Sequence, residues 1–137
     1  MSDIQRLRLP DHHPVLGSTK VFDTFQYSPA VTAAGLVFIA GQIGLRPDGT
    51  IPLDPKEQIK HAFERLGAIL KSLDLNFTSV VELVSYHVNL STLLADFREV
   101  KEHYIKSDFP AWTILGVASL ARPELVIEIK VIAAAKR

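Results

Sequence analysis

Apolar residues recur at helical spacing in the stretch that follows Asp54. Steps of four and three place one stripe on a single helix face, formed by Ile59, Phe63, Leu66, Leu70 and Leu73. Asp54 suits the N-cap, Pro55 the first helical position and Glu57 the third residue after the cap, so the pattern predicts a helix that ends near Asp74. Four charged residues fall off the stripe and are expected to be solvated: Lys60, Glu64, Arg65 and Lys71.

A second, shorter helical stripe and several β-prone runs complete the pattern. The stripe is formed by Leu94, Phe97, Val100 (or Lys101) and Tyr104. Runs rich in β-branched and aromatic residues predict strands at 20–25, 36–40, 80–90, 111–120 and 125–132. Strands with two separated helices predict an α+β fold, with both helices packed on one face of the sheet.

The start of the chain has no such periodicity. Residues 1–18 contain Pro10, Pro14 and Gly17 and are expected to form an irregular arm, followed by a single domain over 19–137. The pattern also makes the second face of the sheet apolar. Because a monomer rarely exposes an apolar face of that size, we expect a homo-oligomer.

Composition narrows the class of protein. The 137 residues and 15.2 kDa fit one domain. Lys plus Arg number 15 and Asp plus Glu number 15, a balance that argues against a nucleic-acid partner. The absence of Cys excludes disulfides, thiolate nucleophiles and Cys-ligated metals. No apolar run approaches the roughly 20 residues of a membrane helix. We therefore expect a cytoplasmic protein without a membrane partner.

Glu128 is the most suggestive residue for chemistry. It lies between Ile127 and Ile129 in a strongly apolar strand, where a carboxylate is costly to bury unless it is paired. Alternation puts Glu128 and Lys130 on one face and Ile127 and Ile129 on the other. Two readings stay open: an ion pair with a neighbouring cation such as Lys130, or a partly desolvated general base with a raised pKa that orients water.

Other candidates are weaker when each is taken alone. Trp112, the only Trp, can wall off a ligand or cap the hydrophobic core. Tyr27 stands in a loop from which its hydroxyl can reach a site. The five histidines include no pair at metal-binding spacing on a helix and no HExxH motif, so no metal site is expected.

Several segments, in order, resemble the reactive intermediate deaminase family (RidA/YjgF, endoribonuclease L-PSP-like). The resemblance runs from about residue 19 to the C-terminus. It is carried by Tyr27–Val31 (YSPAV), Gly35–Ile43 (GLVFIAGQI), Gly49, Gln58, Val80–Glu82 (VVE), Phe97, Tyr104, Phe109–Ala111 (FPA) and Ile127–Ile129 (IEI).

The resemblance implies a chorismate-mutase-like α+β fold, assembled as a homotrimeric barrel with sites in the clefts between subunits. It also implies cofactor-independent hydrolysis of enamines and imines. Tyr27 and Glu128 match family site residues, and Gly41 matches as close backbone at the cleft. Where the family's deaminase branch has an Arg that clamps the substrate carboxylate, this chain has Trp112; a family Asn is replaced by Lys101.

These observations predict a hydrolase in which Glu128 directs water and the substrate is not held by the usual Arg–carboxylate fork. Tyr27, Gly41, Trp112 and Lys101 are expected to bind the substrate, a small molecule, without metal or cofactor. The alternative is a non-catalytic trimer that binds a small metabolite or a partner protein in the same cleft. Ribonuclease activity is not favoured, because a chain with no net charge lacks the excess of positive charge that neutralises RNA phosphates.

Overall fold

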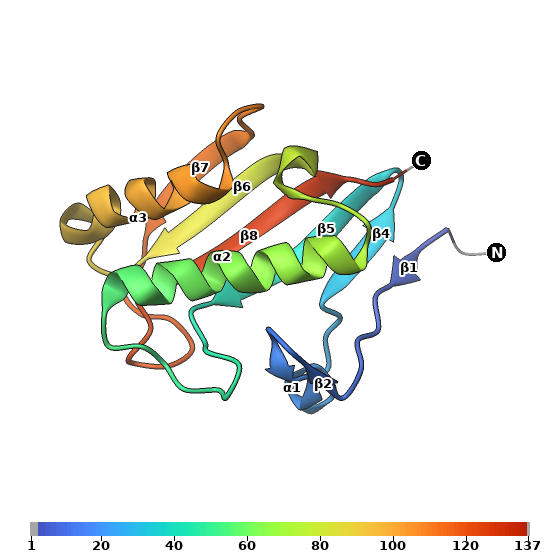
Figure 1. The fold of residues 1–137 in the computed structure, drawn as a ribbon, viewed down its shortest axis with the longest axis horizontal. Helices are drawn as coiled ribbons and strands as arrows, with labels where there is room; N and C mark the ends of the chain where they lie inside the picture. Colours follow the sequence, from blue (N-terminus) through green and yellow to red (C-terminus); the bar gives the residue numbers. More distant parts are fainter. Residues whose placement is uncertain (1–2, 137) are drawn as a thin grey trace.

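A six-stranded mixed sheet forms the centre of the structure, a computed structural model that describes residues 3–136 (Figure 1). In spatial order its strands are β1 (Gln5–Arg6), β4 (Ala30–Ala33), β5 (Leu36–Ile43), β8 (Ile127–Ala134), β6 (Val80–His87) and β7 (Ala111–Gly116). Neighbouring strands run antiparallel except β6 and β7, which are parallel. The α+β class is thereby confirmed.

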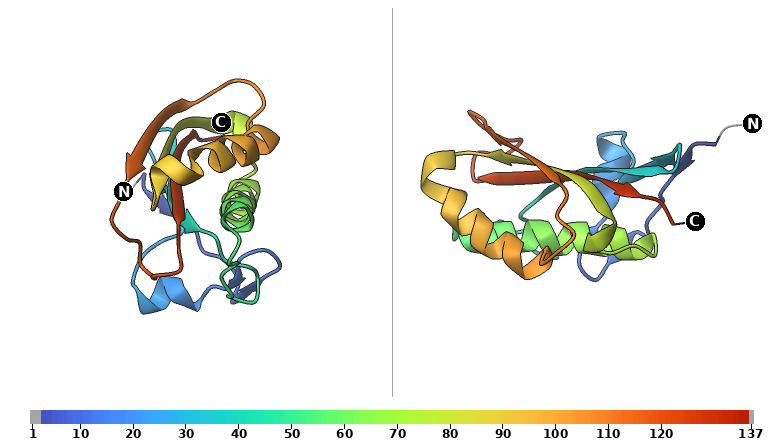
Figure 2. Two further views of the ribbon diagram at one scale, coloured as in Figure 1. Left: turned by 90° about the vertical axis from the view of Figure 1, so that its left-hand side faces the viewer. Right: turned by 90° about the horizontal axis from the view of Figure 1, so that it is seen from above.

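Two long helices cover one face of this sheet (Figures 1 and 2). They are α2 (Pro55–Ser72) and α3 (Leu90–Tyr104), and both predictions are confirmed. The Asp54 side chain accepts a hydrogen bond from the Lys56 amide at 3.1 Å and caps α2. Just past the end of α2, Asp74 adopts the left-handed conformation with φ 57°, which stops the helix where the sequence predicted.

The hydrophobic core lies between these helices and the sheet. Alternate residues of β8 face the core and are buried, namely Ile127, Ile129, Val131 and Ala133. The apolar stripe of α2 packs against them, with Phe63, Leu66 and Leu70 fully buried. The alternation of β8 therefore places its side chains as predicted: Ile127 and Ile129 face the core, and Glu128 points away from it.

The beginning of the chain is more regular than expected. Residues 1–18 were predicted to be an irregular arm, yet β1 pairs with β4, and β2 (His12–His13) pairs with β3 (Gly17–Ser18). The prediction of a strand at 20–25 is wrong, because this segment forms the short helix α1 (Lys20–Thr24). The views of Figure 2 place α1 on the opposite side of the sheet from α2 and α3.

Two further features adjust the sequence predictions. The segment before β6 forms a 3-10 helix, Phe77–Ser79, with Asn76 as its cap. The strand predicted at 111–120 ends at Gly116.

None of the helices in the described part of the chain is both long enough and apolar enough to cross a membrane.

The second face of the sheet combines apolar and charged side chains. Phe38 lies opposite Ile132 across β5 and β8, and Leu115 lies beside Tyr86 across β7 and β6. Phe38 and Leu115 are 44% and 43% exposed, while Lys130 on the same face is also exposed. The face is therefore less uniformly apolar than the sequence pattern indicated.

Candidate active site

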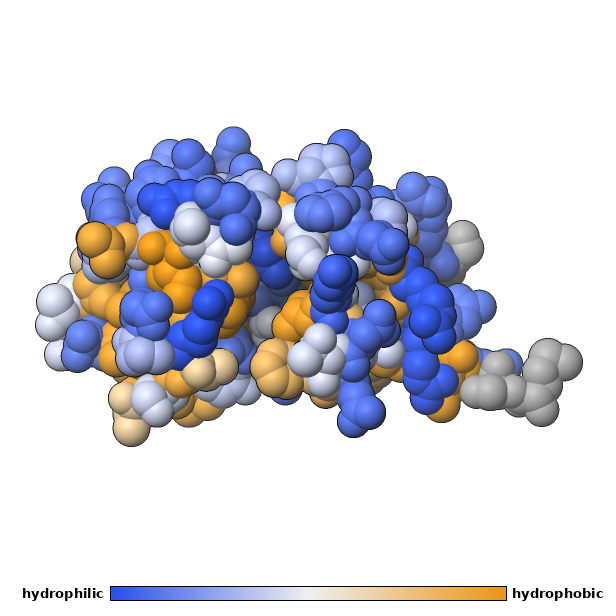
Figure 3. Space-filling view, turned by 90° about the horizontal axis from the view of Figure 1, so that it is seen from below, coloured by the Kyte–Doolittle hydropathy of each residue, from blue (hydrophilic) through white to orange (hydrophobic). Residues whose placement is uncertain are grey.

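A cavity of about 550 Å³ opens at one end of the sheet. Its walls come from the N-terminal segment, α1, the end of β5 with the loop that follows it, one residue of α2 and Glu128 of β8. Figure 3 views the molecule from this side, where hydrophobic patches show between polar side chains. The size suits a small-molecule ligand.

Glu128 lies half-buried at this cavity. Its neighbours across the strands are Ile43 on β5 and Tyr86 on β6. Among residues 3–136, no hydrogen bond or ion pair involves its carboxylate, and Lys130 makes no ion pair with it. Burial raises the pKa of Glu128. This arrangement favours the reading of a partly desolvated base over that of a surface ion pair.

Gly41 lets the carboxylate of Glu128 approach the backbone of β5. The β5–β8 register shifts between Ile39 and Gln42, so Gly41 lies in a bulge. A Cβ built on Gly41 would collide with Oε2 and Cδ of Glu128. Any side chain at this position would therefore displace the Glu128 carboxylate, so glycine is favoured here by close approach rather than by backbone conformation.

Tyr27 reaches the same cavity from the turn after α1. Its ring packs edge-on against Phe22, with the centroids 5.0 Å apart, and Gln26 before it adopts the left-handed conformation with φ 59°. Burial raises the pKa of Tyr27; nearby Arg65 lowers it and Glu128 raises it. The structure thus brings together Tyr27, Gly41 and Glu128, three of the five predicted site residues.

Arg65 is the cavity residue that the sequence analysis missed. It was predicted to be solvated on α2, but only 7% of it is exposed and it lines the cavity. Burial lowers its pKa. One signal was present in the sequence: a row beside the predicted stripe, at steps of four, three and four, consists of Gln58, Ala62, Arg65 and Ile69, all of them buried.

Trp112 and Lys101 lie elsewhere in the chain, in a separate hollow between α3 and the start of β7. The Lys101 ammonium stands 4.8 Å from the Trp112 ring centroid and 5.8 Å from that of Phe109, within cation–π range. Burial lowers the pKa of Lys101. Within one chain these two residues line a different hollow from Glu128; their place in a cleft between subunits stays a prediction.

The Trp112 indole belongs to a buried polar chain on β6. Its Nε1–H donates to Ser85 Oγ at 2.9 Å, and Ser85 Oγ lies 2.8 Å from His87 Nε2. If the hydroxyl accepts from Trp112, it can donate its own proton to His87, which then acts as an acceptor. Burial lowers the pKa of His87 and favours that neutral form. Phe97 packs edge-on against the His87 ring.

The described residues contain no group of three or more His, Cys, Asp or Glu side chains placed to hold a metal ion. His13 instead accepts backbone hydrogen bonds from Val15 and Leu16 at Nδ1, and His61 lies 3.9 Å from Glu57. Glu128, Tyr27 and Arg65 give the cavity a carboxylate, a phenol and a guanidinium, and the other polar side chains that line it are His12, Ser18, Gln42 and Asp48. They can orient water, transfer a proton and bind an anion.

Comparison with known proteins agrees with the geometry. The profile of the family described as Endoribonuclease L-PSP matches residues 20–135. The RutC family protein YjgH of Escherichia coli is 34% identical over 118 residues, which cover 85% of this chain and 88% of that protein. The human 2-iminobutanoate/2-iminopropanoate deaminase is 34% identical over 115 residues, with 78% of each chain covered.

Solved structures show the same fold. A structure of YjgH superposes with a TM-score of 0.78 at 32% identity, covering 85% of this chain and 89% of that one. Yeast Mmf1, at 23% identity, gives a TM-score of 0.81 over 97% of this chain and 99% of its own. Sequence and fold lead to the same conclusion: the chain belongs to the Endoribonuclease L-PSP family, also known as RidA/YjgF.

Proposed function

We propose that the protein is a cofactor-independent hydrolase of imines or enamines, in which Glu128 directs the attack of water. The observation that carries this proposal is the carboxylate of Glu128, half-buried at a cavity and without an ionic partner among residues 3–136. Such a carboxylate is a stronger base than a solvated one, because burial disfavours its charged form.

The reaction is a proton transfer coupled to water addition. The Glu128 carboxylate accepts a proton from water while the water oxygen bonds to the C=N carbon of the substrate. Protonated Glu128 then returns this proton to nitrogen, which gives a carbinolamine. Glu128 next moves the hydroxyl proton of the carbinolamine to its nitrogen, so that the C=O bond forms as the C–N bond breaks and ammonia leaves with the electron pair. The products are a carbonyl compound and ammonia. An enamine enters the same path after protonation at carbon gives the imine.

Tyr27 and Gly41 assist this reaction without themselves forming or breaking covalent bonds. The Tyr27 hydroxyl lines the cavity and interacts electrostatically with both Glu128 and Arg65, so it can orient the water or the substrate nitrogen. Gly41 leaves room for the carboxylate. The relatives named as 2-iminobutanoate/2-iminopropanoate deaminases support imines as the substrate class.

Position 112 separates this chain from the deaminase branch of the family. The Trp112 indole is an uncharged donor that is already bonded to Ser85, so it cannot provide the guanidinium fork that binds a carboxylate at two points. We infer that the substrate of this protein is not held at that position.

We also propose that the active form is a homotrimer with its sites between subunits. The exposed Phe38 and Leu115 on the open face of the sheet favour burial against other copies. Association would also bring further groups to the cavity, such as Trp112 and Lys101, which a single chain keeps apart from Glu128. Light scattering should give three times the chain mass of 15.2 kDa; a stable monomer would remove the trimer and the interfacial site.

Ammonia release tests the catalytic proposal. Imines generated in situ by an amino-acid or amine oxidase, with and without a carboxylate, are mixed with the protein, and release is compared with the uncatalysed rate. Acceleration on any of these imines would support a hydrolase. An intact oligomer that binds the corresponding carbonyl compounds but accelerates no imine would contradict it and favour the ligand-binding alternative.

A further inference from the structure

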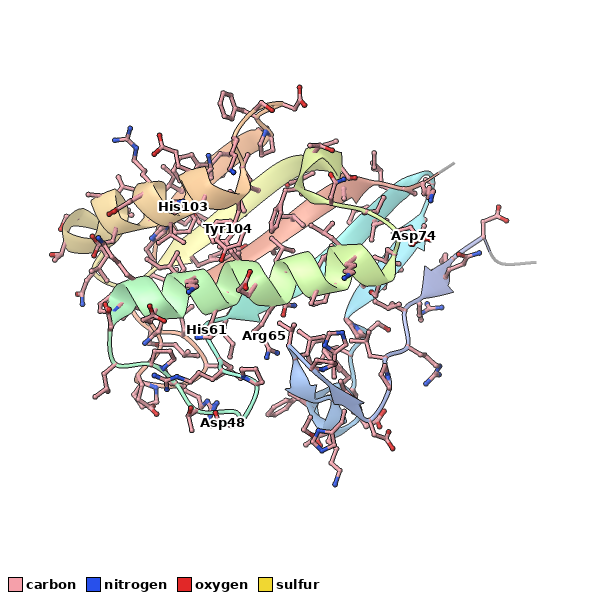
Figure 4. All side chains as sticks on the ribbon, in the orientation of Figure 1. Asp48, His61, Arg65, Asp74, His103 and Tyr104 are labelled. Carbon is pink, nitrogen blue, oxygen red and sulfur yellow. The ribbon has the colours of Figure 1, made fainter. Side chains whose placement is uncertain are left out.

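Arg65 is a cation buried without an acidic partner. Its side chain leaves α2 toward the N-terminal segment (Figure 4), and only 7% of the residue is exposed. In the part of the chain that the structure describes, the ion pairs involve Lys56 and His61, and none involves Arg65. Charged side chains are rarely buried unless they are paired, because burial removes them from water.

The fold leaves most donors of this guanidinium unused. An Arg side chain carries five N–H donors. Nη1 donates to the Leu16 carbonyl at 3.1 Å, whereas Nε is buried from solvent and has no hydrogen-bond partner among residues 3–136. Although burial lowers the pKa of Arg65, the group stays charged at neutral pH because an Arg pKa is so high. A positive charge with spare donors therefore remains at the cavity wall.

The surroundings of Arg65 place this charge within the candidate site. Arg65 and Glu128 line the same cavity of about 550 Å³. The charges of Arg65 and Glu128 both act on the hydroxyl of Tyr27: Arg65 lowers its pKa and Glu128 raises it. Glu128 does not neutralise Arg65, because no ion pair joins them. A ligand that carries an anionic group and an electrophilic carbon would match a cation and a base on the walls of one cavity.

We propose that Arg65 anchors the carboxylate of the substrate, so that the protein acts on anionic imino acids held through α2 rather than through position 112. That the rest of the ligand is an imine rests on the proposed function. The binding of a carboxylate by Arg65 does not depend on it. A guanidinium binds a carboxylate through parallel N–H donors and distinguishes it from a neutral group of the same shape.

A purely structural role for Arg65 makes a different prediction. If its only task is to tie α2 to the Leu16 carbonyl, removing its charge should alter stability but not the choice between charged and neutral ligands. The test therefore compares two unreactive probes of nearly equal size, pyruvate and its neutral amide, pyruvamide.

The first measurement uses the unmodified chain, so it does not depend on a variant that folds. The side-chain Nε–H resonance of Arg65 is assigned by its loss in Arg65→Lys and is then followed by NMR during titration. Pyruvate should shift this resonance in a saturable way, and pyruvamide at equal concentration should not. Equal responses to both probes, or no response to pyruvate, would overturn the proposal.

The second measurement gives the size of the effect. Removing charged hydrogen bonds should weaken pyruvate binding by about 10- to 100-fold in Arg65→Gln while leaving pyruvamide unaffected. Lys60→Gln is the matched control, because Lys60 is exposed on the same helix and the net charge changes equally. A pyruvate preference that survives in folded Arg65→Gln would assign the residue a structural role only.

The two proposals fail separately. Arg65-dependent pyruvate binding without ammonia release from any imine would remove the hydrolase and keep the anion site. Glu128-dependent ammonia release that is equally fast in Arg65→Gln, for charged and neutral imines alike, would keep the hydrolase and remove the anion site.

Discussion

The carboxylate of Glu128 lies against the backbone of Gly41, in the space that a side chain at position 41 would occupy. The bulge of β5 and the alternation of β8 meet at this point, and the carboxylate is directed toward the cavity that Tyr27 also lines. The placement of the candidate base thus depends on the absence of a Cβ on the neighbouring strand.

Gly41→Ala should therefore impair activity by displacing the carboxylate. The added Cβ overlaps the end of a side chain, which can rotate away, so the fold should survive. The rate of imine hydrolysis should fall by about 10- to 100-fold, less than complete loss of a general base would cost. Gly116→Ala is the control, because a Cβ there meets only ordinary contacts with Leu90 at 3.6 Å and beyond. Activity that is unchanged in Gly41→Ala would show that the carboxylate position does not matter.

Much of the fold follows from periodicity alone. The stripe of α2 and the alternation of β8 are long patterns whose local preference agrees with their tertiary packing. The segment Lys20–Thr24 is too short to show a periodic pattern that would predict its structure. Its structure depends on distant contacts, since the Thr19 hydroxyl just before it donates to the Pro10 carbonyl at 2.6 Å and Phe22 packs against Tyr27.

The site was only partly predictable for the same reason. Alternation placed Glu128 on the face away from the core, and the family resemblance indicated Tyr27 and Gly41. Arg65 was missed because its environment is made by the backbone of Leu16, 49 residues earlier in the chain. Trp112 was predicted to line a cleft between subunits, and no local sequence pattern indicates that its indole donates to Ser85 of its own chain.

The raised pKa of Glu128 predicts how stability depends on pH. Below its ordinary value of 4.5, the group is protonated in both the folded and the unfolded state. As the pH rises, the unfolded chain loses this proton first, so the free energy of unfolding falls until the pH passes the raised folded pKa. Glu128→Gln should therefore be nearly neutral in acid and stabilising at neutral pH.

Urea denaturation at several pH values measures this difference. The matched control is Glu102→Gln, which removes the same charge from an exposed position on α3. A Glu128→Gln variant that is destabilised at neutral pH would mean that the carboxylate has a stabilising partner.

Gln58 connects α2 to the loop that leads into β8. Its Nε2 donates to the carbonyls of Pro52 at 2.9 Å and Glu124 at 2.8 Å, and its Oε1 accepts from the Val126 amide at 3.0 Å. Gln58→Ala leaves these buried groups unpaired and should lower the free energy of unfolding by about 2 to 4 kcal/mol.

Chemical denaturation measures the loss in Gln58→Ala. Lys60→Ala, on an exposed position of the same helix, should change stability by no more than about 0.5 kcal/mol. An equally small effect in Gln58→Ala would mean that the three hydrogen bonds are not needed to hold the start of β8.

The bond between Trp112 and Ser85 predicts an energetic coupling. A double-mutant cycle with Trp112→Phe and Ser85→Ala should give a coupling of about 1 kcal/mol in the free energy of unfolding, because each single change breaks the same 2.9 Å bond. A cycle of Trp112→Phe with the distant Ser72→Ala should be additive. Additivity in the first cycle as well would show that the indole does not depend on the hydroxyl.

The most direct test of the central claim is the pH profile of imine hydrolysis in three proteins: wild type, Glu128→Gln and Glu128→Asp. A general base must be deprotonated, so the wild-type rate should rise with pH through an apparent pKa above the ordinary Glu value of 4.5. Glu128→Gln should lose this rise together with roughly 100-fold or more of the rate, and Glu128→Asp should retain the rise at reduced activity. A Glu128→Gln variant with the wild-type rate and the wild-type profile would contradict the assignment of Glu128 as the base.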